Sequence, residues 1–427
     1  MHFLTVLYTF LALGGISSAA STPQRRAASG LLFNPPGFAP LPSPTTHRGP
    51  QPLVAGGTPS LNTSNIQGDI LGQASNANAL GDPAPIENNW EPVFVDTSSL
   101  HGVFLIGAND NTTINAALNQ ITTALGDSIT ELYSLQAQAR PGAEQGHEHF
   151  GFLDGISQPG VEGFTTNPVN GQIVVPAGVI LVGEDGDNAG RPAWAKDGSF
   201  LAFRQLQQLV PEFNKFLLDN AVFVTGVNGI EEGSELLGAR MMGRWKSGTP
   251  VELSPLHDNL TIAGDPNLIN NFNFTLAGDN SLCPFAAHIR KTNPRSDLSN
   301  TAVDPHRIIR GGTPYGPEVT ADEAASNVTS IQRGLAFVAY QSNIAQGFQF
   351  LQQTWANNPN FLGHPNFPLP GFDPIIGANH GQERFTQGLD PANQTRNITL
   401  VQDFIVSRGG EYFFSPSLSA IINTIAA

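Results

Sequence analysis

The chain alternates between strand-like and helix-like hydrophobic patterns, and this alternation limits the folds that it can adopt. Residues 92–110 contain short β-rich runs, and the segment after them places four apolar side chains on one helical face: Ile114, Leu118, Ile121 and Leu125. The same order returns later, with a buried strand expected at 335–341 and a helix at 344–358. We therefore expect an α+β chain of two halves, with a boundary near residues 225–240.

Two local features refine this expectation. Thr112 or Thr113 is available to cap the first helix, because a threonine side chain can accept a hydrogen bond from a free N–H of the first turn. Residues 199–218 are expected to be helical, with an interruption or kink at Pro211.

The N-terminus carries an apolar run that ends in small residues, the pattern of a secretory signal peptide at 1–20. A membrane anchor is the alternative, but the run is short and its end is rich in Gly and Ser. Residues 21–60 are dense in Pro, Gly and Ser, which favours a pro-segment or flexible tail. We expect a secreted, extracellular protein whose folded part starts near residue 61.

Secreted chains commonly rely on disulfides, but Cys283 is the only cysteine in this sequence. Core burial, with or without a bound cofactor, must therefore hold the fold. Asn-x-Ser/Thr sequons support a secretory route and a glycoprotein. They lie at Asn62, Asn111, Asn259, Asn273, Asn327, Asn393 and Asn397.

The formal net charge of −15 argues against two classes of partner. Nucleic-acid binding requires clustered Lys and Arg, and an acidic membrane repels an anionic surface. We therefore expect no nucleic-acid partner and no membrane partner.

The stretch EHFGFLDGISQPG, residues 148–160, places one carboxylate, Asp154, among glycines and apolar residues. An Asp-Gly pair is common in turns, because Asp tolerates unusual backbone angles and the glycine can take a positive φ. Beside it, His147 and His149 would project to one face of a strand and could bind a metal with Glu144 or another carboxylate. The ligand set is incomplete, and the turn, the metal site and a catalytic role all stay open at this point.

A second motif, CPFAAHIRKTNPR at 283–295, sets His288 among small and apolar residues, with arginines following at 290, 295, 307 and 310. An imidazole in such surroundings can ligate haem iron, and guanidinium groups can bind the two haem propionates. A packed or surface histidine is the alternative. The chain has no Cys-x-x-Cys-His attachment motif, so any haem would be held non-covalently.

Five segments together resemble the fungal secreted dye-decolourising haem peroxidases, and the resemblance extends over nearly all of the chain from about residue 61. They are GFLDGISQPG, GARMMGRWKSGTPVELSP, CPFAAHIRKTNPR, HRIIRGGTPYG and RGLAFVAYQS. The family's hallmark Gly-x-x-Asp-Gly is matched by residues 151–155. The resemblance implies an enzyme that reduces hydrogen peroxide and oxidises dyes, phenols and other aromatic reductants through a ferryl porphyrin radical.

The resemblance also implies roles for single residues. Asp154 matches the distal acid-base residue, and Arg310 matches the arginine that stabilises anionic peroxide and favours ionised Asp154. An acidic pH optimum follows, because a carboxylate remains a base at lower pH than a histidine does. His288 matches the proximal iron ligand. Asp373 is a candidate partner for its second ring nitrogen, with a structural turn as the alternative.

Other matched positions concern the haem pocket and electron transfer. Arg295 matches a position that binds a haem propionate, with a surface arginine as the alternative. Leu335 and Phe337 match apolar residues that line a cavity open to peroxide but closed to a bulky dye. Large substrates would then react at the haem edge or through Tyr315 and Trp355, which resemble the family's surface-radical sites; packing is the alternative for Trp355.

The implied fold has two ferredoxin-like domains with antiparallel sheets, as in the dimeric α+β barrel superfamily, at 61–230 and 231–427. One haem b would lie between sheet and helices in a monomer or weak dimer. A non-catalytic haem carrier or scavenger would use the same pocket, but it would not require the distal Asp154 and Arg310. One departure is Gly311, where the family motif often has a second arginine, so substrate range transfers less directly than peroxide activation.

Overall fold

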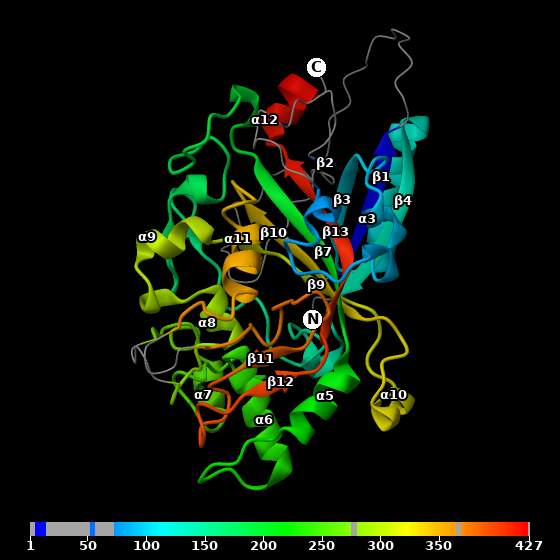
Figure 1. The fold of residues 1–427 in the computed structure, drawn as a ribbon. Helices are drawn as coiled ribbons and strands as arrows, with labels where there is room; N and C mark the ends of the chain where they lie inside the picture. The colour runs from blue at the N-terminus through cyan, green and yellow to red at the C-terminus, as the bar shows by residue number, and fades with distance from the viewer. Residues whose placement is uncertain (1–4, 14–51, 56–71, 275–279, 364–368, 426–427) are drawn as a thin grey trace.

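The computed structural model describes residues 5–13, 52–55, 72–274, 280–363 and 369–425, and its centre is a sheet of nine strands (Figure 1). Neighbouring strands follow the order β7-β13-β2-β3-β1-β4-β9-β10-β8, and β7 also pairs with β10, so the order closes into a ring. Every pairing in it is antiparallel. The bounds are β1 (Thr5–Leu13), β2 (Pro52–Ala55), β3 (Gly102–Ala108), β4 (Ile129–Gln138), β7 (Ser199–Gln208), β8 (Ile309–Arg310), β9 (Thr313–Tyr315), β10 (Gly334–Gln341) and β13 (Ile405–Ser415).

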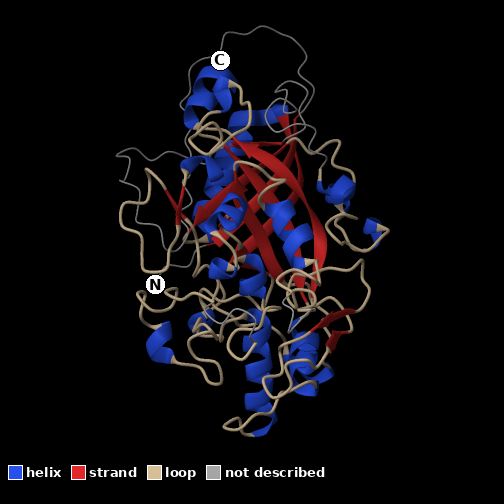
Figure 2. Cartoon of the chain, turned by 60° about the vertical axis from the view of Figure 1, so that its left-hand side comes forward, coloured by secondary structure: helices blue, strands red, loops and turns tan. Residues whose placement is uncertain are grey.

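Helices and short strands surround this sheet (Figure 2). The expected α+β class is confirmed. The helices are α2 (Gln73–Asn76), α3 (Pro92–Val95), α4 (Asn111–Leu125), α5 (Val210–Asp219), α6 (Gly229–Met242), α7 (Leu260–Ala263), α8 (His288–Thr292), α9 (Asn300–Val303), α10 (Ala321–Ser326), α11 (Phe348–Phe350) and α12 (Leu418–Ala420). The small strand pairs are β5 (Gly160–Val161) with β6 (Val174–Val175), and β11 (Arg384–Thr386) with β12 (Ile398–Leu400).

The helix expected after residue 110 is present as α4, but its cap differs from the one we expected. Asp110 is the N-cap, and its Oδ1 accepts a hydrogen bond from the N–H of Thr113 at 2.8 Å. Ile114 and Ile121 of α4 are buried and pack against β3. The apolar face thus packs against the sheet at three of its four expected positions, including partly buried Leu118, whereas Leu125 at the end of the helix is exposed.

Residues 199–208 form strand β7, so the helix expected there is wrong. This strand lies between β13 and β10, and its residues are buried along nearly the whole length. A strand with neighbours on both edges and cover on both faces has no polar and apolar alternation, so its pattern does not identify it. The helix begins only at α5, with Pro211 in its first turn, where a missing N–H breaks no helical hydrogen bond.

The helix expected at 344–358 is shorter in the structure. It consists of α11 and a π-helical segment at Leu351–Ala356 that continues it. Figure 1 places α8, α9 and α11 along one side of the sheet. This arrangement leaves a cavity between the helices and strands β7, β10 and β13.

Part of the expected N-terminal organisation lies outside the described residues, including 14–51 and 56–71. Strand β1 falls within the expected signal peptide and pairs with both β3 and β4. The boundary at residue 230 stays a prediction, although β7 precedes it and has its partners β10 and β13 after it. Among the described residues, no helix is both long enough and apolar enough to cross a membrane.

Candidate active site

The cavity has a volume of about 270 Å³ and is bounded by one face of the sheet and by the helices that cover it. Leu335 and Phe337 of β10 line it. Leu335 lies directly opposite Leu206 of β7 in the ladder, so both side chains reach the same face of the sheet. The helices contribute Met242, at the end of α6, and Ile289 of α8. Apolar side chains thus line both sides of this cavity.

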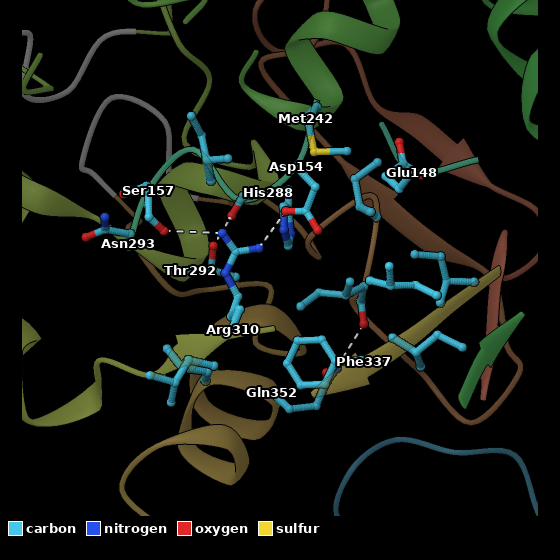
Figure 3. Close-up of a pocket in the computed structure, with 18 of the residues that line it drawn as sticks. Glu148, Asp154, Ser157, Met242, His288, Thr292, Asn293, Arg310, Phe337 and Gln352 are labelled. Carbon is cyan, nitrogen blue, oxygen red and sulfur yellow. Dashed lines mark hydrogen bonds and ion pairs between the residues drawn. The ribbon is translucent and has the colours of Figure 1, made fainter. Parts of the chain in front are cut away.

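Asp154 and Arg310 meet at the edge of this cavity (Figure 3). Nη1 of Arg310 donates to Oδ1 of Asp154 at 2.8 Å, and the N–H of Gly155 donates to the same oxygen at 2.6 Å. Gly155 has a φ of +79°, so the Asp-Gly turn is real and holds the carboxylate in place. No described residue donates to Oδ2, which leaves that oxygen available to a ligand in the cavity.

Arg310 is held by the loop that carries Asp154. Its Nη2 donates to the carbonyl of Ser157 at 3.2 Å. Gln158 binds the backbone of Arg310 twice, with Oε1 accepting from the N–H at 3.0 Å and Nε2 donating to the carbonyl at 2.8 Å. Loop and strand β8 therefore form one unit that fixes the guanidinium beside the carboxylate.

Asp154 is held in its ionised form by this environment. Burial alone would raise the pKa of Asp154, but the charge of Arg310 and the hydrogen bonds from Gly155 and Arg310 outweigh burial and lower it. Both side chains remain 32% exposed, which gives a ligand in the cavity access to them. The pair can therefore accept a proton and bind an anion at one place.

His288 begins α8 and also lines the cavity. Its Nδ1 donates to Oδ2 of Asp373 at 2.8 Å. Asp373 is fully buried, and its Oδ1 accepts the N–H groups of Ile375 at 2.8 Å and Ile376 at 3.0 Å. Asp373 was expected either to bind His288 or to stabilise a turn. It does both, since one carboxylate oxygen accepts from the imidazole and the other accepts from the backbone of the turn. With the proton on Nδ1, the lone pair of Nε2 is available as a metal ligand.

Two arginines at the cavity lack a carboxylate partner among the described residues. Arg244 donates to the carbonyls of Gly248 and Ile269, and Arg295 to those of Asn270 and Phe272. Burial, with the charge of Arg295, lowers the pKa of Arg244 to about 9. Burial, with the charge of Arg307, lowers the pKa of Arg295 to about 10. Both positive charges are therefore short of a counter-ion.

This set of groups fits haem. Apolar walls suit a flat macrocycle, a free imidazole nitrogen suits its iron, and uncompensated guanidinium groups suit its two carboxylates. Arg244 is not among the residues that the sequence motifs pointed to. Gly243 before it ends α6 in a left-handed conformation, with a φ of +91°, and the chain there turns toward the cavity. The sequence feature that could have identified Arg244 is its place in the segment GARMMGRWKSG, which is one of the motifs that resemble the family.

Tyr315 and Trp355 are not on the surface of the described chain, contrary to our expectation. Each is only 3% exposed. Tyr315 belongs to β9 and is part of the hydrophobic cluster that also contains Phe94 and Phe203. Trp355 lines the cavity and stacks on Phe361, with ring centroids 5.0 Å apart. Both rings are buried because they are large and mostly apolar. Tyr315 lies on a strand of the sheet, and Trp355 lies on a helical segment that other residues cover.

The histidine metal site has no support in the structure. Nε2 of His149 lies 2.9 Å from the carbonyl of Tyr315, to which it donates. Burial, the largest influence, lowers the pKa of His149 to about 4. Within the described residues, no three or more His, Cys, Asp or Glu side chains group so that they could hold a metal ion.

Two family models match this chain. The DyP dimeric alpha+beta barrel domain matches residues 70–141, and the Dyp-type peroxidase C-terminal domain matches residues 148–362. The expected superfamily is therefore confirmed.

Known relatives agree with these models. The chain is 55% identical to Peroxidase 2 of Mycetinis scorodonius, over 84% of this chain and 72% of that protein. It is 48% identical to a dye-decolorizing peroxidase of Auricularia auricula-judae, over 88% of this chain and 77% of that protein. A crystal structure of a decolorizing peroxidase from Auricularia auricula-judae superimposes with a TM-score of 0.84 at 42% identity, covering 99% and 96% of the two chains.

These matches confirm the resemblance drawn from the five sequence segments and favour an enzyme over a haem carrier. The chain therefore belongs to the DyP-type peroxidase family of haem enzymes and is a peroxidase.

Proposed function

We propose that the chain is a secreted peroxidase with one non-covalent haem b, in which His288 ligates the iron and Asp154 and Arg310 act on hydrogen peroxide. The supporting observation is that His288, Asp154 and Arg310 line one cavity between sheet and helices. A haem carrier would need the imidazole but not an ionised carboxylate paired with a guanidinium. Leu335, Phe337, Arg244 and Arg295 would hold the haem through apolar contact and charge.

The residues of this cavity divide the chemistry between them. Bound haem would supply the redox-active iron and the two electrons that cleavage of the O–O bond requires. Asp154 would take a proton at Oδ2 from one peroxide oxygen and return it to the other, which can then leave as water when the O–O bond breaks. Arg310 stabilises the negative charge that develops on the peroxide. Asp373 fixes the imidazole of His288 with its proton on Nδ1, which strengthens Nε2 as a ligand.

Reducing substrates would be dyes, phenols and other aromatic compounds. Small phenols would react at the haem edge, and bulky dyes would deliver electrons through Trp355 or Tyr315. Burial of both rings does not prevent this, because an electron can pass to a ring that is covered by other side chains. We further propose a monomer or weak dimer.

Secretion rests on the N-terminal apolar run and on the sequons. Six of the sequons have an asparagine among the described residues; five of these asparagines are exposed and the sixth, Asn259, is partly exposed. All six are thus accessible to glycosylation. A mature protein that starts after residue 20 would lack β1, and the edges of β3 and β4 that pair with it would be open. N-terminal sequencing of the protein from culture medium, before and after deglycosylation, tests both points; a sequence that starts at Met1 contradicts the signal peptide.

The decisive experiment is the absorption spectrum of the purified protein before and after one equivalent of hydrogen peroxide. A haem band that changes with peroxide and returns on adding a phenol supports the proposal. A haem band that is inert to peroxide contradicts the roles of Asp154 and Arg310. Failure to bind haem on reconstitution contradicts the cofactor.

A further inference from the structure

Glu148 is a buried carboxylate at the cavity, six positions before Asp154 (Figure 3). It is only 8% exposed. Among the described residues, no cation forms an ion pair with the side chain of Glu148. Arg140 is nearby, but its Nη1 donates to the backbone carbonyl of Glu148, at 2.8 Å, and not to the carboxylate. A charged group in such a place must be satisfied by hydrogen bonds.

Three N–H groups satisfy this carboxylate. Oε1 accepts from the N–H of Phe152 at 2.9 Å, and Oε2 accepts from the N–H of Phe150 at 2.9 Å. The side-chain amide of Gln208 also donates to Oε2. Because all three neighbours are donors, the arrangement fits an ionised Glu148, around which the loop 148–152 is wound.

Gln208 connects this loop to the sheet. It belongs to β7, is 2% exposed and lines the cavity. While its Nε2 donates to Glu148, its Oε1 accepts from the N–H of His149 at 3.3 Å. One amide therefore binds both the side chain and the following backbone of the loop. Two residues after this loop comes Asp154, whose own N–H donates to the carbonyl of Gly146 at 3.0 Å.

We propose that Glu148 and Gln208 form a clamp that positions Asp154 for proton transfer. Both are positioning residues, since they act through the loop and not on the peroxide. This inference rests on the proposed role of Asp154, and it adds a pair of residues to which neither the sequence motifs nor the family comparison gives a function.

The charges around the clamp decide how the pH dependence should respond. Glu148 interacts with Asp154 and Arg140, while Asp154 interacts with Arg310 and His288. Burial raises the pKa of Glu148, and the charge of Asp154 adds to this, while its three N–H donors oppose it. The pKa of Asp154 is lowered, so Glu148 is already protonated in the acid range where Asp154 titrates. Removing the charge of Glu148 should therefore leave the pKa of Asp154 unchanged.

The test compares Glu148→Gln with Glu411→Gln in the haem-loaded protein. Glu411 is the matched control, because it is 6% exposed, accepts the N–H groups of Gln73 and Tyr412, and does not line the cavity. We expect Glu148→Gln to keep its haem spectrum and to react with peroxide about tenfold or more slowly, as loss of alignment at a proton-transfer group implies. The acid limb of this rate, its fall at low pH, should stay where it is in the parent, because Asp154 titrates below Glu148. Glu411→Gln should change neither quantity.

Two further measurements make the clamp testable if Glu148→Gln folds poorly. Gln208→Leu leaves the Glu148 charge and its backbone bonds in place, and should also slow the peroxide reaction. The exchange Glu148→Gln with Gln208→Glu reverses the donor and acceptor, and should recover part of the rate. Hydrogen exchange at the amides of Phe150 and Phe152 should be faster in Glu148→Gln than in the parent, independently of turnover.

The outcomes separate the clamp from the proposed function. A normal peroxide rate in folded Glu148→Gln or Gln208→Leu overturns the clamp, as does an equal loss of rate in Glu411→Gln. If Asp154→Asn itself reacts normally with peroxide, the role of Asp154 fails, and the clamp has no proton transfer to support.

Discussion

Nη1 of Arg310 lies 2.8 Å from Oδ1 of Asp154, although 156 positions separate the two residues in the chain. The contact joins the loop after His149 to strand β8, and it occupies one carboxylate oxygen while the other faces the cavity. An acid-base group that is held ionised beside a fixed positive charge suits the heterolytic cleavage of a peroxide. This relationship leads to the first two predictions.

Asp154→Asn should keep haem and slow the reaction with peroxide by on the order of a hundredfold to ten-thousandfold, because it removes the proton acceptor while keeping the shape of the side chain. Stopped-flow absorbance measures this rate. Asp219→Asn, at an exposed carboxylate that pairs with Lys215, is the control and should react normally. A parental rate in Asp154→Asn would assign the proton transfer to another group.

Arg310→Leu should move the acid limb of the peroxide reaction to higher pH. The pKa of Asp154 is lowered in the parent because the charge and hydrogen bond of Arg310, with the N–H of Gly155, outweigh burial. Without Arg310 that pKa rises, so Asp154 is protonated, and inactive as a base, over more of the acid range. Arg310→Lys keeps the charge and should shift the limb less. An unmoved limb would show that another group governs it.

Asp373→Asn should bind haem but raise the reduction potential of the bound iron. The carboxylate accepts the Nδ1–H of His288 and makes the imidazole a stronger ligand, and an amide does this less. Spectroelectrochemical titration measures the potential. Asp390→Asn is the matched control, because Asp390 also accepts two backbone N–H groups in a turn but does not contact His288. Equal reduction potentials in the parent and in Asp373→Asn would mean that Asp373 only stabilises the turn.

Arg244→Leu and Arg295→Leu should each weaken haem binding by roughly tenfold to a hundredfold, the effect expected when a charge-assisted hydrogen bond is lost. Competition with an apo-globin for haem measures the affinity. Arg396→Leu, whose partner Asp390 lies outside the cavity, should bind haem normally. Normal affinity in both cavity variants would place the propionates elsewhere.

Trp355→Phe should slow the turnover of a bulky dye more than that of a small phenol, because only the dye depends on electron transfer from outside the cavity. Trp194→Phe is the control: Trp194 is partly buried against Phe414 and does not line the cavity. Steady-state rates with both substrates provide the comparison. An equal decrease for the two substrates would mean that Trp355 only packs against Phe361.

Sequence patterns that depend on a few neighbouring residues were informative. The apolar spacing of 111–125 gave α4, and the order of five motifs gave the family and the fold class. Asp154 stood out because a lone carboxylate among glycines and apolar residues is unusual, and its turn with Gly155 is present. Asp373 was a candidate partner of His288, and the two side chains are in contact.

Only the tertiary structure decided the features that depend on distant segments. β7 is a strand because β10 and β13 bind both of its edges, although its own pattern suggested a helix. Tyr315 and Trp355 are buried because other elements cover them. Arg244 lacks a counter-ion because no described carboxylate folds to within reach of it. The reason is the same in each case: local sequence sets dihedral preferences and hydrophobic periodicity, whereas burial, charge pairing and strand partners are set by packing between segments that the sequence separates.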